Sequence, residues 1–166
     1  MRGRACPPLP HEQRAVPPGP PAPLYPVLGH QPLRTPKEPA IDPRALAAAA
    51  AHLADQKKAE DIRVFDVEDH IKVADYFMVC TGTSRPHVRA ILDELHVRLK
   101  AAGARHAKAE GADTGWWVLL DFGDVVVHIL QPEAREHYRL DDLYKECELL
   151  DWQAEQLPEL PETSRS

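Results

Sequence analysis

The stretch that decides the fold is residues 115–130, GWWVLLDFGDVVVHIL, in which two apolar runs flank a short turn. Apolar and β-branched residues on both sides of a glycine-containing turn predict an antiparallel β-hairpin. With Phe122 and Gly123 at the turn, Val118 lies opposite Val127. One face of this hairpin is then wholly apolar and must belong to the core. It comprises Trp116, Val118, Leu120, Val125, Val127 and Ile129.

The second face of the hairpin mixes apolar side chains with two carboxylates and an imidazole: Trp117, Leu119, Asp121, Asp124, Val126 and His128. Such a face cannot be core throughout, so we expect an exposed apolar patch with a polar rim. Tryptophan and tyrosine are common anchors of protein interfaces, which favours a docking surface that Tyr138, Leu140 and Tyr144 extend. Two alternatives stay open: scattered surface hydrophobes, or a helix of the same chain that covers the patch.

Upstream of the hairpin, the pattern predicts a helix, two strands, a second helix and a short third strand. Asp42 and Pro43 suit the start of the first helix, and Ser84 suits the N-cap of the second. The second strand, the second helix and the third strand form a β-α-β unit, which predicts parallel pairing. One more helical stretch follows Pro132, which breaks the hairpin. The predicted ranges are 43–59, 61–67, 74–81, 85–102, 105–110 and, for the last helix, 140–150.

Proline content divides the chain into a leader, a domain and a tail. Twelve of the 17 prolines lie in residues 1–40, which predicts a disordered Pro-rich leader because proline blocks both helix and sheet. We expect one folded domain over residues 41–151 and a flexible tail over residues 152–166. No uninterrupted apolar run approaches the roughly 20 residues that span a bilayer, which excludes an integral membrane protein.

Charge narrows the class of partner. Residues 41–151 hold fourteen lysines and arginines against twenty-one acidic residues, so the domain is acidic. This argues against broad or sequence-specific nucleic-acid binding and permits docking to a basic protein. The three cysteines form no metal-like spacing and suit free thiols in a reducing compartment.

Two motifs suggest chemistry, and neither is specific. The pair Asp121 and Asp124 in DFGD could bind a metal ion, although a solvated turn pair explains it as well. The stretch TGTS, residues 81–84, enters a helix and could hold a phosphate, but it lacks a Gly-rich nucleotide signature. Cys80 lies in an apolar strand and reads as a core thiol. We therefore expect no catalytic residues, no cofactor and no metal, with a nucleotidyltransferase-like nucleotide-binding protein as the enzymatic alternative.

Several segments, in this order and spacing, resemble the ribosomal silencing factor family, also called Iojap-like: DIRVFDV, VADYFMVCTGTSRPHVRAI, AEG, GWWVLLDFGDVVVHIL and EHYRLDDLY. The resemblance covers roughly residues 43–150. It implies an α/β fold with a mixed β-sheet and helices packed mainly on one face, related to nucleotidyltransferase-like folds but without catalysis. It also implies a cytoplasmic translation repressor. Such a factor binds the large ribosomal subunit at its protein fourteen and sterically blocks joining of the small subunit, especially in nutrient limitation.

The resemblance also carries over to single positions. Trp117 matches the family's aromatic before VLLDFGD and is the expected anchor of partner binding. The other partner-binding positions that it implies are Leu119, Asp121, His128, Tyr138, Leu140 and Tyr144. Arg85-Pro86 departs from the family pattern, where Ser-Arg or Ser-Lys is frequent. A role in large-subunit assembly, as in organelle relatives, and a homodimer through the hairpin face remain alternatives.

Overall fold

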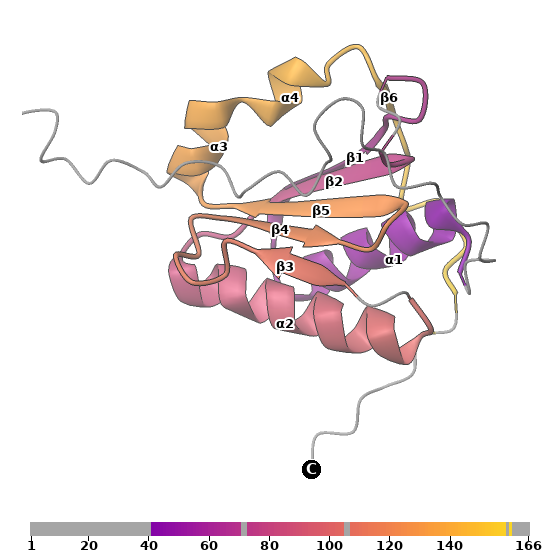
Figure 1. The fold of residues 1–166 in the computed structure, drawn as a ribbon, viewed down its shortest axis with the longest axis horizontal. Helices are drawn as coiled ribbons and strands as arrows, with labels where there is room; N and C mark the ends of the chain where they lie inside the picture. Colours follow the sequence, from indigo (N-terminus) through magenta and orange to yellow (C-terminus); the bar gives the residue numbers. More distant parts are fainter. Residues whose placement is uncertain (1–40, 71–72, 105–106, 159, 161–166) are drawn as a thin grey trace, which may run out of the picture.

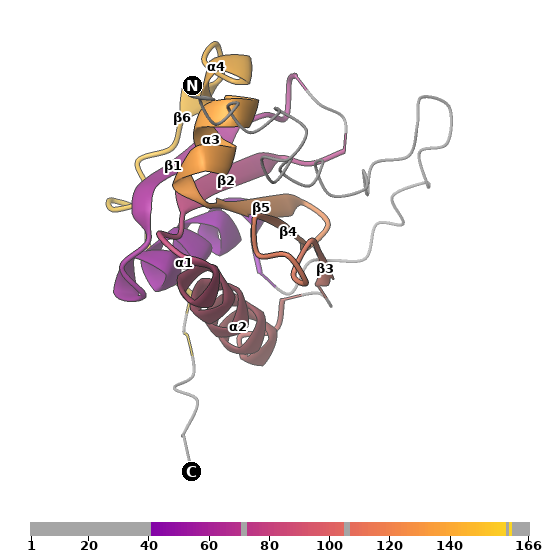
Figure 2. The ribbon, with the colours of Figure 1, turned by 90° about the vertical axis from the view of Figure 1, so that its left-hand side faces the viewer.

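The computed structural model describes residues 41–70, 73–104, 107–158 and 160. They form one six-stranded mixed sheet in the order β3-β4-β5-β2-β1-β6, with helices on both of its faces (Figures 1 and 2). The elements are α1 (Pro43–Gln56), β1 (Glu60–Asp66), β2 (Tyr76–Thr81), α2 (Arg85–Ala101), β3 (Lys108–Glu110), β4 (Trp117–Asp121), β5 (Val125–Leu130), α3 (Pro132–Tyr138), α4 (Leu140–Leu143) and β6 (Glu148–Leu149). The expected mixed α/β fold is confirmed, whereas the relation to nucleotidyltransferase-like folds stays a prediction.

The two long helices begin where the sequence predicts and share one face of the sheet. The Asp42 carboxylate accepts from Ala45 N (3.3 Å), and the Ser84 hydroxyl accepts from His87 N (3.2 Å), so both N-caps are confirmed. Both helices bury their apolar side chains against residues such as Val118 and Ile129 in one core cluster. This is the wholly apolar face expected for the hairpin.

The parallel pair of the sheet is not the predicted one. Strand β2 pairs in parallel with β5, while β3 pairs only with β4, so the hairpin β4-β5 lies between the two strands of the expected β-α-β unit. Strand β5 is buried along its whole length, as a central strand must be. Strand β3 has three residues, of which Lys108 and Ala109 are exposed, and this suits a sheet edge.

The hairpin forms with a register that differs by two residues from the predicted one. Val118 pairs with Ile129 and Leu120 with Val127, because the turn centres on Gly123 and Asp124. Gly123 takes a positive φ of 97°, which glycine adopts without steric strain. An even shift keeps every side chain on its face, so the predicted division into two faces holds. Trp116 is the exception: it precedes β4 and packs with the second cluster.

The region after the hairpin differs most from expectation. Instead of one helix over 140–150, the chain forms α3 and α4 and then adds β6 to the sheet, where Leu149 pairs with Phe65. Pro132, interpreted from the sequence as a breaker, stands in the first turn of α3, where proline is favoured because that position needs no amide donor. Helices α3 and α4 lie on the sheet face opposite α1 and α2 (Figure 2).

The packed domain also extends beyond its predicted end at Asp151. The ring of Trp152 meets that of His52 edge to face at 4.9 Å, and His52 Nε2 donates to the Trp152 carbonyl (3.0 Å). Glu155 accepts two hydrogen bonds from Arg44 on α1. The first residues of the expected flexible tail therefore pack against α1, while the predicted leader, residues 1–40, lies outside the described residues.

Candidate functional site: the aromatic layer and the Arg135 pocket

Most of the predicted docking residues gather in an aromatic layer on the second face of the sheet. We define this layer as Phe65, Phe77, Trp117, His128, Tyr138 and Tyr144. The Trp117 and Tyr138 rings lie 4.7 Å apart, and Phe77 meets His128 and Tyr144 edge to face at 4.9 and 5.1 Å. Strands β1, β2, β4 and β5 supply one side of the layer, and the segment from α3 to the end of α4 supplies the other. Rings in these arrangements stabilise one another beyond simple burial.

The expectation that Trp117 is exposed is wrong. Only 9% of its surface is accessible, because Tyr138 at the end of α3 packs against the indole with its ring tilted by 46°. Its Nε1 donates to His128 Nδ1 (3.2 Å), so the polar atom of the ring is also satisfied internally. The alternative in which a helix covers this face is therefore the correct one.

Three further predicted docking residues are buried with it. Leu119 and His128 are each 3% exposed, and Leu140 is 6% exposed. Only the three half-buried members of the predicted set reach the surface: Asp121, Tyr138 and Tyr144. The sequence grouped these residues correctly on one side of the sheet but could not show the two short helices that close over it.

His128 is held neutral inside this layer. Its Nδ1 accepts the Trp117 hydrogen bond, so Nε2 carries the proton, and this Nε2 is buried without a hydrogen-bond partner among the described residues. Burial lowers the pKa of His128 to about 3. A protonated imidazole would lose the Trp117 contact and introduce an uncompensated charge, so His128 serves packing and not proton transfer.

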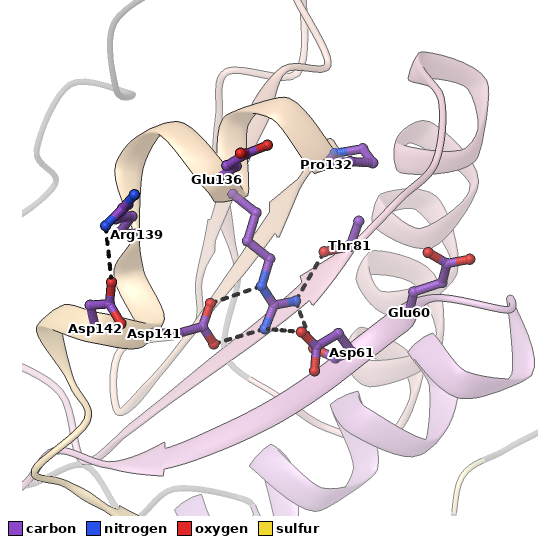
Figure 3. Close-up of a pocket in the computed structure, with 9 residues that line it drawn as sticks. Glu60, Asp61, Thr81, Pro132, Glu136, Arg139, Asp141 and Asp142 are labelled. Carbon is purple, nitrogen blue, oxygen red and sulfur yellow. Dashed lines mark hydrogen bonds and ion pairs between the residues drawn. The ribbon is translucent and has the colours of Figure 1, made fainter.

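A second feature, which the sequence did not predict, is a pocket of about 420 Å³ built around Arg135 (Figure 3). The Arg135 guanidinium forms a two-pronged pair with the Asp141 carboxylate at 2.8 and 2.9 Å. Its Nη1 also donates to the Asp61 carbonyl (2.6 Å) and to the Thr81 hydroxyl (2.9 Å). Arg135 thus ties α3 and α4 to the ends of β1 and β2.

The backbone of β1 is shaped for this arginine. Asp61 has a positive φ of 48°, and the β1–β2 register is irregular between Glu60 and Arg63. This bulge leaves the Asp61 carbonyl unpaired in the sheet and free to accept from Arg135. Burial acts to raise the pKa of Asp141, but the hydrogen bonds and charge of Arg135 outweigh it and lower that pKa. In the sequence, this cluster is marked only by the run EHYRLDDLY, which follows Arg135 and contains Asp141. Its hydrophobic pattern does not show that these two side chains pair.

The motifs with suggested chemistry are engaged in internal contacts. Thr83 N donates to His87 Nδ1 (2.9 Å), and His87 Nε2 donates to the Lys57 carbonyl (2.7 Å). With the Ser84 cap, these bonds make TGTS a connection between α1 and α2. Asp121 accepts from Gly123 N (2.7 Å) within the hairpin turn, and burial raises the pKa of its carboxyl.

The described part of the chain contains neither a metal-binding cluster nor a membrane-spanning helix. No group of three or more His, Cys, Asp or Glu residues there could hold a metal ion. None of the helices in the described ranges is both long and apolar enough to span a bilayer.

Known proteins resemble this chain over the same packed domain. Residues 40–166 match the family model described as "Ribosomal silencing factor during starvation". The "Ribosomal silencing factor RsfS" of Bacillus subtilis is 39% identical over 111 residues, which cover 67% of this chain and 94% of that protein. The mouse "Mitochondrial assembly of ribosomal large subunit protein 1" is 36% identical over 111 residues, covering 63% and 49%. The crystal structure of protein CV0518 from Chromobacterium violaceum superposes with a TM-score of 0.61 at 31% identity, covering 63% and 88%.

Proposed function

Because this chain belongs to the ribosomal silencing factor family, we propose that it represses translation by binding the large ribosomal subunit and blocking joining of the small one. The observation that carries the proposal is the family match, which spans the whole packed domain from α1 through the residues that follow β6. In this proposal the factor acts in the cytoplasm.

The contact on the large subunit is its ribosomal protein fourteen. The acidic charge of the domain supports a basic protein as the partner, since opposite charges speed association and exclude wrong partners. A factor that is bound to the large subunit at the face where the two subunits meet leaves no room for the small subunit. Binding alone is therefore sufficient for repression.

No chemistry is required for this activity. The contacts of TGTS and of Asp121 within the fold support a non-catalytic role, because they give these groups a structural function as a helix connection and a hairpin turn. The factor therefore acts by steric occlusion and needs no cofactor.

The docking side is the outer surface of α3 and α4 above the aromatic layer. Trp117, Leu119, His128 and Leu140 support this surface from beneath, and this is their role in partner binding. Tyr138 and Tyr144 at this surface, and Asp121 at the end of β4, are half-buried and are the members of the predicted set that can touch a partner directly. In this proposal the buried residues hold the docking surface in place, and the three half-buried residues contact the partner.

A second candidate function is a role in assembly of the large subunit. It is favoured by the mouse relative, whose name describes mitochondrial assembly of the ribosomal large subunit. Both functions need the same large-subunit contact, and they differ in whether mature subunits are the target.

A joining assay separates the two. Purified mature large subunits are mixed with the protein, small subunits are added, and light scattering follows the formation of joined ribosomes. We expect a dose-dependent decrease in joining that is complete when the protein saturates the large subunits. Binding to mature large subunits without any effect on joining would contradict repression by occlusion and favour the assembly role.

A further inference from the structure

Exposed apolar side chains are few and unevenly placed. Among the described residues, four large ones are exposed: Leu143 (67%), Leu149 (56%), Val97 (49%) and Leu157 (39%). The two most exposed both come from the short segment that runs from α4 to β6. Removing a leucine side chain from water is favourable, so these two exposed leucines can contribute binding energy when a partner covers them.

Leu143 and Leu149 lie on either side of Tyr144 in the chain, on elements at the same end of the molecule. Leu149 pairs directly with Phe65 across β6 and β1, so its side chain points to the same sheet face as Phe65. The Tyr144 ring lies over this face, 6.1 Å from Phe65 and 5.1 Å from Phe77. Leu143 precedes Tyr144 at the end of α4. Figure 1 shows α4 and β6 at the same end of the molecule, away from α2. We call Leu143, Tyr144 and Leu149 the Leu–Tyr patch.

Acidic side chains surround the Leu–Tyr patch. Asp142 precedes Leu143, Glu148 precedes Leu149, and Glu146 lies between them; all three are exposed. Lys145 is the single basic residue in residues 142–149. Asp142 also lines the Arg135 pocket and pairs with the exposed Arg139 (3.8 Å), so the negative charge of the rim comes mainly from Glu146 and Glu148. The patch therefore has an apolar centre and a negative rim.

We propose that the Leu–Tyr patch docks a basic segment of a large-subunit protein, in which an apolar side chain is flanked by lysines or arginines. This inference rests on the proposed function and names the chemistry of the contact. The apolar centre supplies burial, and the acidic rim attracts and orients the basic flanks.

Charge excludes the two other candidate occupants. Ribosomal RNA presents phosphates, which Glu146 and Glu148 of the rim repel. A second copy of this chain, paired about a two-fold axis, would set the same acidic rim against itself. A basic protein segment is the occupant that gains from both the centre and the rim.

The test compares two double variants for binding to purified large ribosomal subunits. L143A/L149A removes the centre of the patch, and V97A/L157A removes the two other exposed apolar side chains as a matched control. We expect the patch variant to bind at least about tenfold more weakly, because residues at the centre of an interface carry most of its binding energy. The control variant should bind like the unmodified chain. Thermal denaturation verifies that both variants fold, and the single variant L143A serves if L149A disturbs β6.

A charge variant tests the rim. E146Q/E148Q should associate with large subunits more slowly than the unmodified chain, and the difference should shrink as salt is raised. Tighter binding after this neutralisation, or competition by protein-free large-subunit RNA, would overturn a protein partner in favour of RNA. A dimer in sedimentation that L143A dissociates would overturn it in favour of a second copy.

The inference and the proposed function can fail separately. If the unmodified chain binds large subunits and L143A/L149A binds equally well, the patch is not the contact while the function stands. If the unmodified chain does not bind large subunits at all, the proposed function itself is wrong.

Discussion

Truncation of Trp117 to alanine should destabilise the fold and not merely a docking contact. The indole is 9% exposed, packs against the Tyr138 ring at 4.7 Å and donates to His128. Removing a buried tryptophan costs about 3–5 kcal/mol, because apolar contact is lost and a cavity remains. A domain of this size has a total stability of about 5–15 kcal/mol, so roughly a fifth of it or more would be lost.

The assay is thermal and urea denaturation followed by circular dichroism. At roughly 3–5 °C per kcal/mol for a domain of about 110 residues, W117A should melt roughly 10–20 °C below the unmodified protein. The matched variant W117F keeps an aromatic ring against Tyr138 but loses the donor to His128, and it should cost only about 1–2 kcal/mol. An unchanged melting temperature for W117A, together with weaker binding to large subunits, would refute the buried layer and restore an exposed anchor.

Three further predictions concern the other contacts. Burial lowers the pKa of His128 to about 3, against 6.5 for a free imidazole, so the unfolded chain binds the extra proton between these values. Stability should therefore fall as pH drops below about 6.5, by at most about 1.4 kcal/mol per unit, and H128N should flatten this part of a urea-midpoint profile. R135A leaves the Asp141 carboxylate, the Asp61 carbonyl and the Thr81 hydroxyl without their donor, and should lower the free energy of unfolding by about 3–5 kcal/mol; a loss below 1 kcal/mol would show that the cluster is dispensable. W152A should release the C-terminal segment from α1, with faster amide exchange in α1 and a loss of about 1–2 kcal/mol, and unchanged exchange would contradict that packing.

Local patterns predicted the elements well because their signals are local. The caps at Asp42 and Ser84 follow from side chains that accept from nearby backbone amides. The division of the hairpin into two faces survived a wrong register, since a shift of two residues restores every side chain to its face. Gly123 set the turn one position later than expected, because its positive φ suits the first of the two central positions.

Long-range pairing could not be predicted in the same way. The insertion of β4-β5 between β2 and β3 depends on which strand is buried on both faces, and apolar runs in β2 and β5 are alike in the sequence. The cover over Trp117 depends on α3 and α4, which have seven and four residues. Helices this short depend on tertiary packing and leave little periodicity to read.

The partner-binding role of the candidate residues stays a prediction. Trp117, Leu119 and Leu140 share one cluster with Tyr138 and Tyr144, but they lie in a layer that α3 and α4 cover, and the sequence did not predict this burial. Arg135 was missed because its partners lie up to 74 residues away in sequence. Leu143 and Leu149 were missed because only a structure distinguishes an exposed leucine from a buried one.

A sedimentation profile of ribosomes in the presence of the protein tests whether it occupies free large subunits. Free subunits and joined ribosomes are separated on a sucrose gradient, and the protein is located by immunodetection in each fraction. We expect the protein to travel with free large subunits, to be absent from joined ribosomes, and to raise the ratio of free to joined particles when it is added. A protein that travels equally with joined ribosomes, or that stays at the top of the gradient, would contradict this expectation.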